Sequence, residues 1–111
     1  MEPKKWHITM DEAAAWPVDP GERSARPLEH GTMHVHWYAP KGRDKQIPHD
    51  QDEIYIIAKG SGEFHREGER VSFQPGDVLF VAAGEDHRFE NFSDDFATWV
   101  VFWGPRGGEP A

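Results

Sequence analysis

The sequence predicts an all-β protein, a sandwich or jelly-roll barrel made of two antiparallel sheets. Short segments rich in β-branched and aromatic residues follow one another along residues 32–103, with glycine or proline turns between them at intervals of about eight to twelve residues. The chain of 111 residues is long enough for one domain with its own core. Five Trp, seven Phe and two Tyr supply large apolar side chains for that core.

Charge and composition narrow the classes of function. The net charge is −8, whereas binding to nucleic acid or to anionic lipid needs clustered Lys and Arg, so neither partner is expected. The absence of cysteine excludes disulfides and thiol nucleophiles and fits a reducing, cytoplasmic location. No long apolar run follows the first lysines, so the N-terminus predicts neither a signal peptide nor a membrane span. Small-molecule chemistry is the class that remains.

Residues 1–31 are expected to form an N-terminal extension with a short strand or helical turn. Thr9 and Glu12 have the spacing of a capping box, and residues 13–16 can form one helical turn before Pro17 ends it. Residues 18–25 contain proline, glycine and charged residues, and are predicted to be a loop.

Residues 32–103 are expected to form the barrel. Residues 32–39 alternate, so that His34, His36 and Tyr38 share one face. Further strands are predicted at 53–58, 63–66, 70–73, 78–81, 87–92 and 96–103, and Lys59 to Gly62 is predicted to be a tight hairpin turn. Residues 104–111 contain two Pro and three Gly and are predicted to be a flexible tail.

The last strand has large apolar residues on both faces. One face carries Phe96, Val100 and Phe102, and the other carries Trp99, Val101 and Trp103. A strand buried on one side only does not need this pattern. A helix, a loop or a second subunit must cover the outer face, and a homodimer is our hypothesis.

Two segments have the spacing of known motifs. Gly76 is followed by five residues, Ala82, Ala83, Gly84, two residues, His87, three residues and Asn91. Upstream, His49 is followed by three residues, Glu53, six residues and Gly60. These spacings resemble the two motifs of the cupin family, although Ile47 stands where that family has its first histidine. The resemblance covers residues 32–103 and implies a cupin-type jelly-roll barrel in a small, single-domain protein.

The resemblance also implies a metal site built from His49, Glu53 and His87. Glu53 and His87 share strand faces with Tyr55 and Phe89, so these side chains converge if those faces turn into the barrel. Two imidazoles and a carboxylate suit a divalent Fe, Mn, Ni, Co or Zn ion and leave coordination positions open. Candidates for a further ligand are Gln46, Gln51, His34 and His36.

The expected pocket walls are Tyr38, Tyr55, Phe80, Phe89 and Phe102, enclosing a small polar organic ligand. The acids Asp44, Asp50 and Asp52 are interpreted as solvated charges and turn formers. Dioxygenase, isomerase and decarboxylase activities all occur on this kind of barrel. The alternative is a non-catalytic module that binds a small ligand or a metal for sensing or storage.

Overall fold

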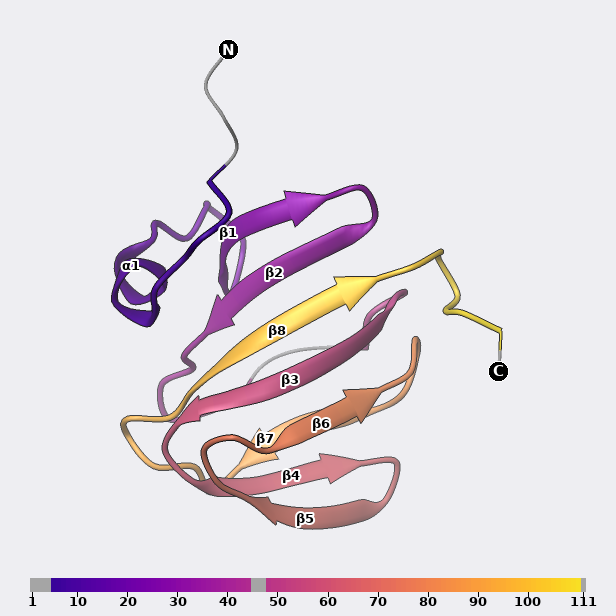
Figure 1. The fold of residues 1–111 in the computed structure, drawn as a ribbon. Coiled ribbons are helices and arrows are strands. Elements are labelled where there is room, and N and C mark those ends of the chain that lie inside the picture. The colour runs from indigo at the N-terminus through magenta and orange to yellow at the C-terminus, as the bar shows by residue number, and fades with distance from the viewer. Residues whose placement is uncertain (1–4, 45–47, 111) are drawn as a thin grey trace.

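The computed structural model describes residues 5–44 and 48–110. Within them, two antiparallel sheets face each other and a short helix lies against the outside of the larger sheet (Figure 1). The larger sheet has the order β1-β2-β8-β3-β6 and the smaller one β5-β4-β7. The elements are α1 (Met10–Ala15), β1 (Ala25–His30), β2 (Met33–Tyr38), β3 (Asp52–Lys59), β4 (Gly62–Arg66), β5 (Glu69–Phe73), β6 (Val78–Val81), β7 (His87–Glu90) and β8 (Ala97–Trp103). This is the predicted jelly-roll architecture.

The helix α1 begins at the predicted capping box. The Thr9 hydroxyl accepts a hydrogen bond from the Glu12 backbone N–H, and the Glu12 carboxylate accepts one from the Thr9 backbone N–H. Ala13 packs with Trp37 in a cluster that also includes Trp99. The helix therefore covers the β2 and β8 end of the outer face. No helix among residues 5–44 and 48–110 is long and apolar enough to cross a membrane.

The interior of the barrel follows from the alternation of β3. Glu53, Tyr55 and Ile57 are buried between the sheets, while Ile54 and Ile56 face outward and are partly or well exposed. Alternation predicts this for a strand with one face on the core. The buried core of the barrel consists of Tyr38, Tyr55, Ile57, Phe64, Phe73, Val81, Phe89, Phe96 and Val100.

The hairpin between β3 and β4 depends on Gly60. Its φ of 83° lies in the left-handed region, and a Cβ at this position would stand 2.6 Å from the Phe96 Cα. Both facts require glycine. The turn brings the end of β3 against the start of β8 and so sets how the two sheets meet.

Two expectations from the sequence about loops and termini need correction. Residues 18–25 were predicted to be a loop, but Ala25 is the first residue of β1. It pairs with Trp37 of β2, and β1 extends the large sheet. The C-terminal segment is docked, because Gly107 donates to the Asp50 carbonyl (2.7 Å) and the Glu109 N–H to Asp52 (2.9 Å). It was predicted to be a flexible tail.

Two acids predicted to be solvated are buried instead. Asp44 accepts hydrogen bonds from the Tyr38 hydroxyl and from the Phe89 N–H. Asp52 accepts from the Ala83 N–H at 3.0 Å as well as from Glu109. Each carboxylate satisfies backbone donors that strand pairing leaves free, which explains its burial. Asp50 is exposed, as predicted, and pairs with Arg106.

Candidate metal centre and adjoining pocket

The structure brings His49, Glu53 and His87 together inside the barrel. One ligand atom from each residue can be chosen so that all three lie within 4.8 Å of one another. Glu53 lies on β3 and His87 on β7, so the two sheets each supply a ligand. The Nε2 atom of His87 and Oε1 of Glu53 are 2.9 Å apart, and both side chains are almost fully buried.

His49 is positioned by a contact between the two motif segments. Its carbonyl accepts a hydrogen bond of 2.7 Å from the Gly84 N–H, so the loop before β3 is tied to the turn before β7. Its ring lies 5.7 Å from that of His87 and packs edge-on against Phe102 at 4.8 Å. The half-buried imidazole is thereby held at the mouth of the site.

A backbone contact orients the His87 ring. Its Nδ1 lies 2.9 Å from the Glu85 carbonyl, which can only accept, so Nδ1 carries a proton, and Nε2 is the ring nitrogen available to a metal ion. The Glu85 side chain is fixed in turn by Arg66, through hydrogen bonds of 3.0 and 2.9 Å, and by the Ala82 N–H at 2.7 Å. Such outer contacts hold a ligating histidine in the tautomer that binds metal.

The chemistry of these atoms fits a metal ion. Nε2 of His87 and both carboxylate oxygens of Glu53 are buried, and despite their closeness none of them has a partner in hydrogen-bonding geometry among the described residues. Buried polar atoms without partners are costly and uncommon. A divalent cation between the imidazoles and the carboxylate would satisfy all of them at once. The His/Glu/His group can therefore hold a metal ion.

The two histidines differ in their affinity for protons. Burial opposes protonation of His87, but the neighbouring Glu53 carboxylate outweighs it, and the pKa of His87 is raised above its ordinary value. Burial lowers the pKa of the His49 imidazole, and Glu53 opposes this only in part. In the absence of metal, the proton at this site therefore belongs to the His87–Glu53 pair.

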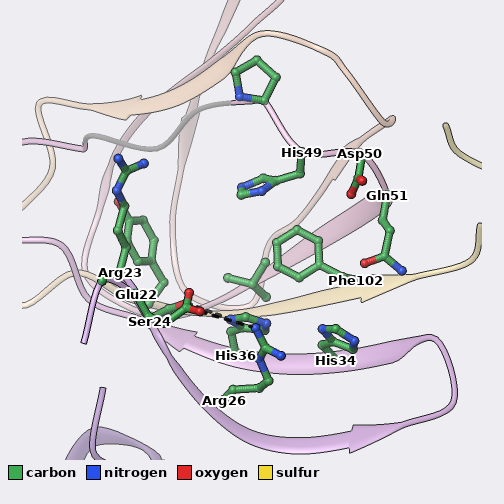
Figure 2. A pocket seen from close by; sticks show the side chains of 14 residues that line it. Glu22, Arg23, Ser24, Arg26, His34, His36, His49, Asp50, Gln51 and Phe102 are labelled. Carbon is green, nitrogen blue, oxygen red and sulfur yellow. Dashed lines mark hydrogen bonds and ion pairs between the residues drawn. The ribbon is translucent and has the colours of Figure 1, made fainter. Parts of the chain in front are cut away.

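A cavity of about 590 Å³ opens beside the metal ligands (Figure 2). This size is typical of sites for small organic ligands, about 300–1,000 Å³. Tyr38, Phe102 and Val100 supply aromatic and apolar wall, and His49 contributes the one metal ligand that reaches the cavity. The rest of the lining is mostly polar and consists of Gly21, Glu22, Arg23, Ser24, Arg26, His34, His36, Pro48, Asp50 and Gln51.

The candidates for a further ligand lie apart from the cluster or outside the described residues. Gln46 falls in the segment 45–47, which the structure does not describe, as does Ile47. The Gln51 amide nitrogen donates to the Thr32 and Gly104 carbonyls at 3.2 and 2.9 Å, which holds this side chain at the rim. His34 and His36 line the cavity but do not belong to the group of three ligand atoms.

The predicted wall residues divide into three groups. Tyr38 and Phe102 line the cavity, whereas Tyr55 and Phe89 are buried deeper, in the aromatic core. Phe80 corrects the prediction: it is 47% exposed on the outer face of the large sheet, near Trp103. Pairing of Glu53 with Val81 and of Tyr55 with Leu79 turns those residues of β6 inward and Phe80 outward.

His36 is a buried histidine outside the His49, Glu53 and His87 group. Its Nδ1 lies 2.8 Å from the Ser24 hydroxyl, and its ring packs edge-on against Phe102 at 5.0 Å. Burial, supported by the positive charge of Arg26, lowers the pKa of His36 to about 4. This imidazole is therefore neutral at pH 7 and forms an uncharged part of the cavity floor.

The sequence pattern did not indicate three polar residues of the cavity. Arg23 and Ser24 precede β1, and Arg26 lies within it. They reach the barrel because β1 pairs with β2 through a register shift between Ala25 and Leu28. A bulge of this kind changes which side chains face inward, and no glycine or motif marks it in the sequence.

The fold and the site define a class of protein: a small jelly-roll barrel with a His/Glu/His group beside an internal cavity. The cupin domain family matches residues 34–103, more than half of the chain. The protein belongs to the cupin family.

Individual relatives agree with this. A protein of Streptomyces coelicolor, described as uncharacterized, is 37% identical over 62 residues, covering 56% of this chain and 59% of that protein. The oxalate-binding protein of Thermotoga maritima is 49% identical over 39 residues, 35% of this chain and 32% of the relative. The chain thus spans less than two thirds of these relatives. The crystal structure of a cupin 2 conserved barrel domain protein from Salinispora arenicola matches with a TM-score of 0.67 at 25% identity over 90% of both chains.

Proposed function

We propose that this protein binds a divalent metal ion through His49, Glu53 and His87, and that it takes a small polar organic molecule into the adjoining cavity as ligand or substrate. The observation that carries the proposal is the set of buried, unpartnered atoms on Glu53 and His87. A fold without a use for them gains by replacing them with apolar groups. Their retention beside a cavity of ligand size supports a metal with a functional role.

Residues around the metal ligands have separate structural roles in this function. Glu85 holds His87 in one tautomer, and the Gly84 N–H fixes the loop that carries His49. Phe102 packs against the His49 ring and walls the cavity on its apolar side. A bound divalent ion supplies Lewis acidity and open coordination positions for ligand oxygens. The donor set suits Fe, Mn, Ni, Co or Zn.

In one form of this function the protein is an enzyme that converts the bound molecule to a product. Dioxygenase, isomerase or decarboxylase chemistry would use the metal to polarise or activate a group on the ligand. The non-catalytic form, a binding module, is favoured by one specific observation: the curated relative with 49% identity over its matched region is an oxalate-binding protein. Oxygen uptake and product analysis with metal-loaded protein and a panel of keto acids, catechols and thiols distinguish the two forms.

Elemental analysis tests the metal site directly. Protein purified without added metal is expected to carry close to one equivalent of a first-row metal or to take it up on dialysis. His87→Ala should lose it. His34→Ala is the matched control, since it removes a cavity histidine outside the ligand group and should keep the metal. Less than a tenth of an equivalent in the wild type after dialysis, or equal occupancy in both variants, would refute the proposed site.

We also propose a homodimer formed through the outer face of the large sheet. Val35, Val101, Ile54 and Phe80 are paired in one row across β2, β8, β3 and β6, and Val78 beyond them is 61% exposed. The helix α1 covers only the Trp37 and Trp99 end of this face. An apolar row of this length favours a second copy as its cover. Light scattering at micromolar concentration tests it, and a monomer mass would refute it.

A further inference from the structure

The cavity carries positive charge at a second place, away from the metal ligands. Arg23 and Arg26 both line it, and both come from the segment that enters β1. Figure 2 shows both of these side chains and that of His49 around the cavity. In a chain of net charge −8, two arginines at one cavity are an unusual local concentration. An arginine is the side chain best suited to hold a carboxylate, through two parallel N–H donors.

The acids at and near the cavity form ion pairs with Arg26 and with Arg106, but not with Arg23. Asp50 is engaged by Arg106, with Nε 2.9 Å from its carboxylate, so its charge is matched outside the cavity. Glu22 lies 3.9 Å from Arg26, and Glu29 lies 3.6 Å from the same guanidinium, so Arg26 is shared between two exposed acids. Arg23 forms no ion pair with any residue that the structure describes. It is the cation of this cavity without a protein partner.

The two arginines act on different parts of the cavity. In Figure 2 the Arg23 side chain lies at the left of the view and reaches toward the level of His49, whereas Arg26 lies at the bottom, near His36 and Ser24. A ligand bound at the metal extends past one or both guanidinium groups.

The surface between the metal and the arginines is aromatic. Phe102 packs edge-on against His49 at 4.8 Å and against His36 at 5.0 Å, so it spans from the metal ligands to the floor. His36 is neutral and its Nδ1 is occupied by Ser24. The Phe102 ring offers apolar contact to a carbon spacer.

We propose that the ligand is a small dicarboxylate. One carboxylate binds at the metal held by His49, Glu53 and His87, a short carbon spacer lies against Phe102, and the second carboxylate pairs with Arg23, with Arg26 in support. The inference rests on the proposed metal-dependent function and names the class of molecule that the same site takes. A monocarboxylate would reach the metal and leave Arg23 in water.

Calorimetric titration of metal-loaded protein tests this. The probes are malonate, succinate and glutarate, which carry a carbon spacer, each compared with the monocarboxylate of the same carbon number. At least one dicarboxylate is expected to bind about tenfold or more tightly than its monocarboxylate partner, the size of one charge-assisted hydrogen-bonded pair. No dicarboxylate exceeding its partner, including no binding by any probe, overturns the inference.

Variants locate the second carboxylate. Arg23→Gln should remove most of the preference for the dicarboxylate and leave the affinity for the monocarboxylate unchanged, and Arg26→Gln should have a smaller effect in the same direction. Arg70→Gln is the matched control, because it removes an equal charge from an exposed ion pair with Glu90 on the small sheet. Equal loss in Arg23→Gln and Arg70→Gln, or a full preference in Arg23→Gln, overturns the assignment.

Measuring the metal content of the same samples distinguishes failure of the dicarboxylate inference from failure of the proposed metal-dependent function. If the wild type holds no metal, the proposed metal-dependent function fails. If it holds metal throughout the titration and shows no preference for a dicarboxylate, only the present inference fails.

Discussion

The two ends of the barrel interior are equally buried but are filled by opposite chemistry. His87 and Phe89 lie two residues apart on β7, and each is 2% exposed. Around Phe89, the rings of Phe64, Phe96 and Tyr55 pack with centroids 4.8, 4.7 and 4.8 Å away. At His87, Nε2 lies 2.9 Å from the Glu53 carboxylate, and neither Nε2 nor the two carboxylate oxygens have a completed hydrogen bond with the residues that the structure describes.

This difference teaches that residues at the Phe89 end stabilise the fold, whereas burial of His87 and Glu53 costs free energy. Aromatic packing gains free energy from burial and from ring geometry. A buried imidazole and carboxylate cost free energy unless a partner satisfies them. We therefore expect substitutions at the Phe89 end to change stability, and substitutions at the His87 end to change metal binding.

The largest effect is expected at the aromatic end. Phe89→Ala should lower the free energy of unfolding by about 3–5 kcal/mol, because it removes a ring packed on several sides and leaves a cavity. Urea denaturation of metal-free protein measures this. Val71→Ala, at a residue that is 50% exposed on the small sheet, is the control and should change little. A loss below 1 kcal/mol for Phe89→Ala would contradict the comparison.

The second prediction concerns pH and sharpens the description of the polar end. The pKa of His36 falls from its ordinary 6.5 to about 4 in the folded state, so between these values the unfolded chain binds more protons. Stability is therefore full above pH 6.5 and is lost as pH falls toward 4, by about 3 kcal/mol at most. His87, whose pKa is raised, acts above pH 6.5 and in the opposite direction.

Denaturation curves at several pH values in the presence of a chelator test this. His36→Phe keeps a ring against Phe102 and removes the titration, so its stability should depend less on pH between 4 and 6.5 than that of the wild type. His49 titrates in the same direction and remains in both proteins. Parallel pH profiles for the two proteins would show that His36 is not the titrating group.

The third prediction concerns the stabilisation that metal supplies to the polar end. At a free metal concentration of 100 times its Kd, the wild type should gain about 2.7 kcal/mol of stability, because only the folded state holds the site. His87→Ala should gain close to none, whereas the metal-free stabilities of the two proteins should differ by less than the loss in Phe89→Ala. An equal gain in His87→Ala would mean that metal binds elsewhere.

The fold and the clustering of His49, Glu53 and His87 could be predicted because both depend on local spacing. The register of Glu53 with Gly60, and of His87 with Gly84, places each ligand on an inward face next to a turn. The position of Arg23 at the cavity could not be predicted, because it depends on how the segment that enters β1 pairs with β2. Asp44 was misread as solvated, because the Phe89 N–H that it accepts from is 45 residues away in sequence.

Substitution of Phe80 has the smallest expected effect on stability, and it tests which face of β6 lies inward. Val78, Leu79, Phe80 and Val81 are all apolar, so the sequence cannot decide which pair of β6 faces inward, and pairing of Glu53 with Val81 decides it. Phe80→Ser should therefore change the free energy of unfolding of the monomer by about 1 kcal/mol or less, as at other exposed positions. Val81→Ser, at a residue 1% exposed, should cost several times more, because it places a hydroxyl in the core. If Phe80→Ser lost more stability than Val81→Ser, the opposite face of β6 would lie inward, and Phe80 would face the barrel interior. If Phe80→Ser also lowers the mass measured by light scattering, the outer face is the dimer interface.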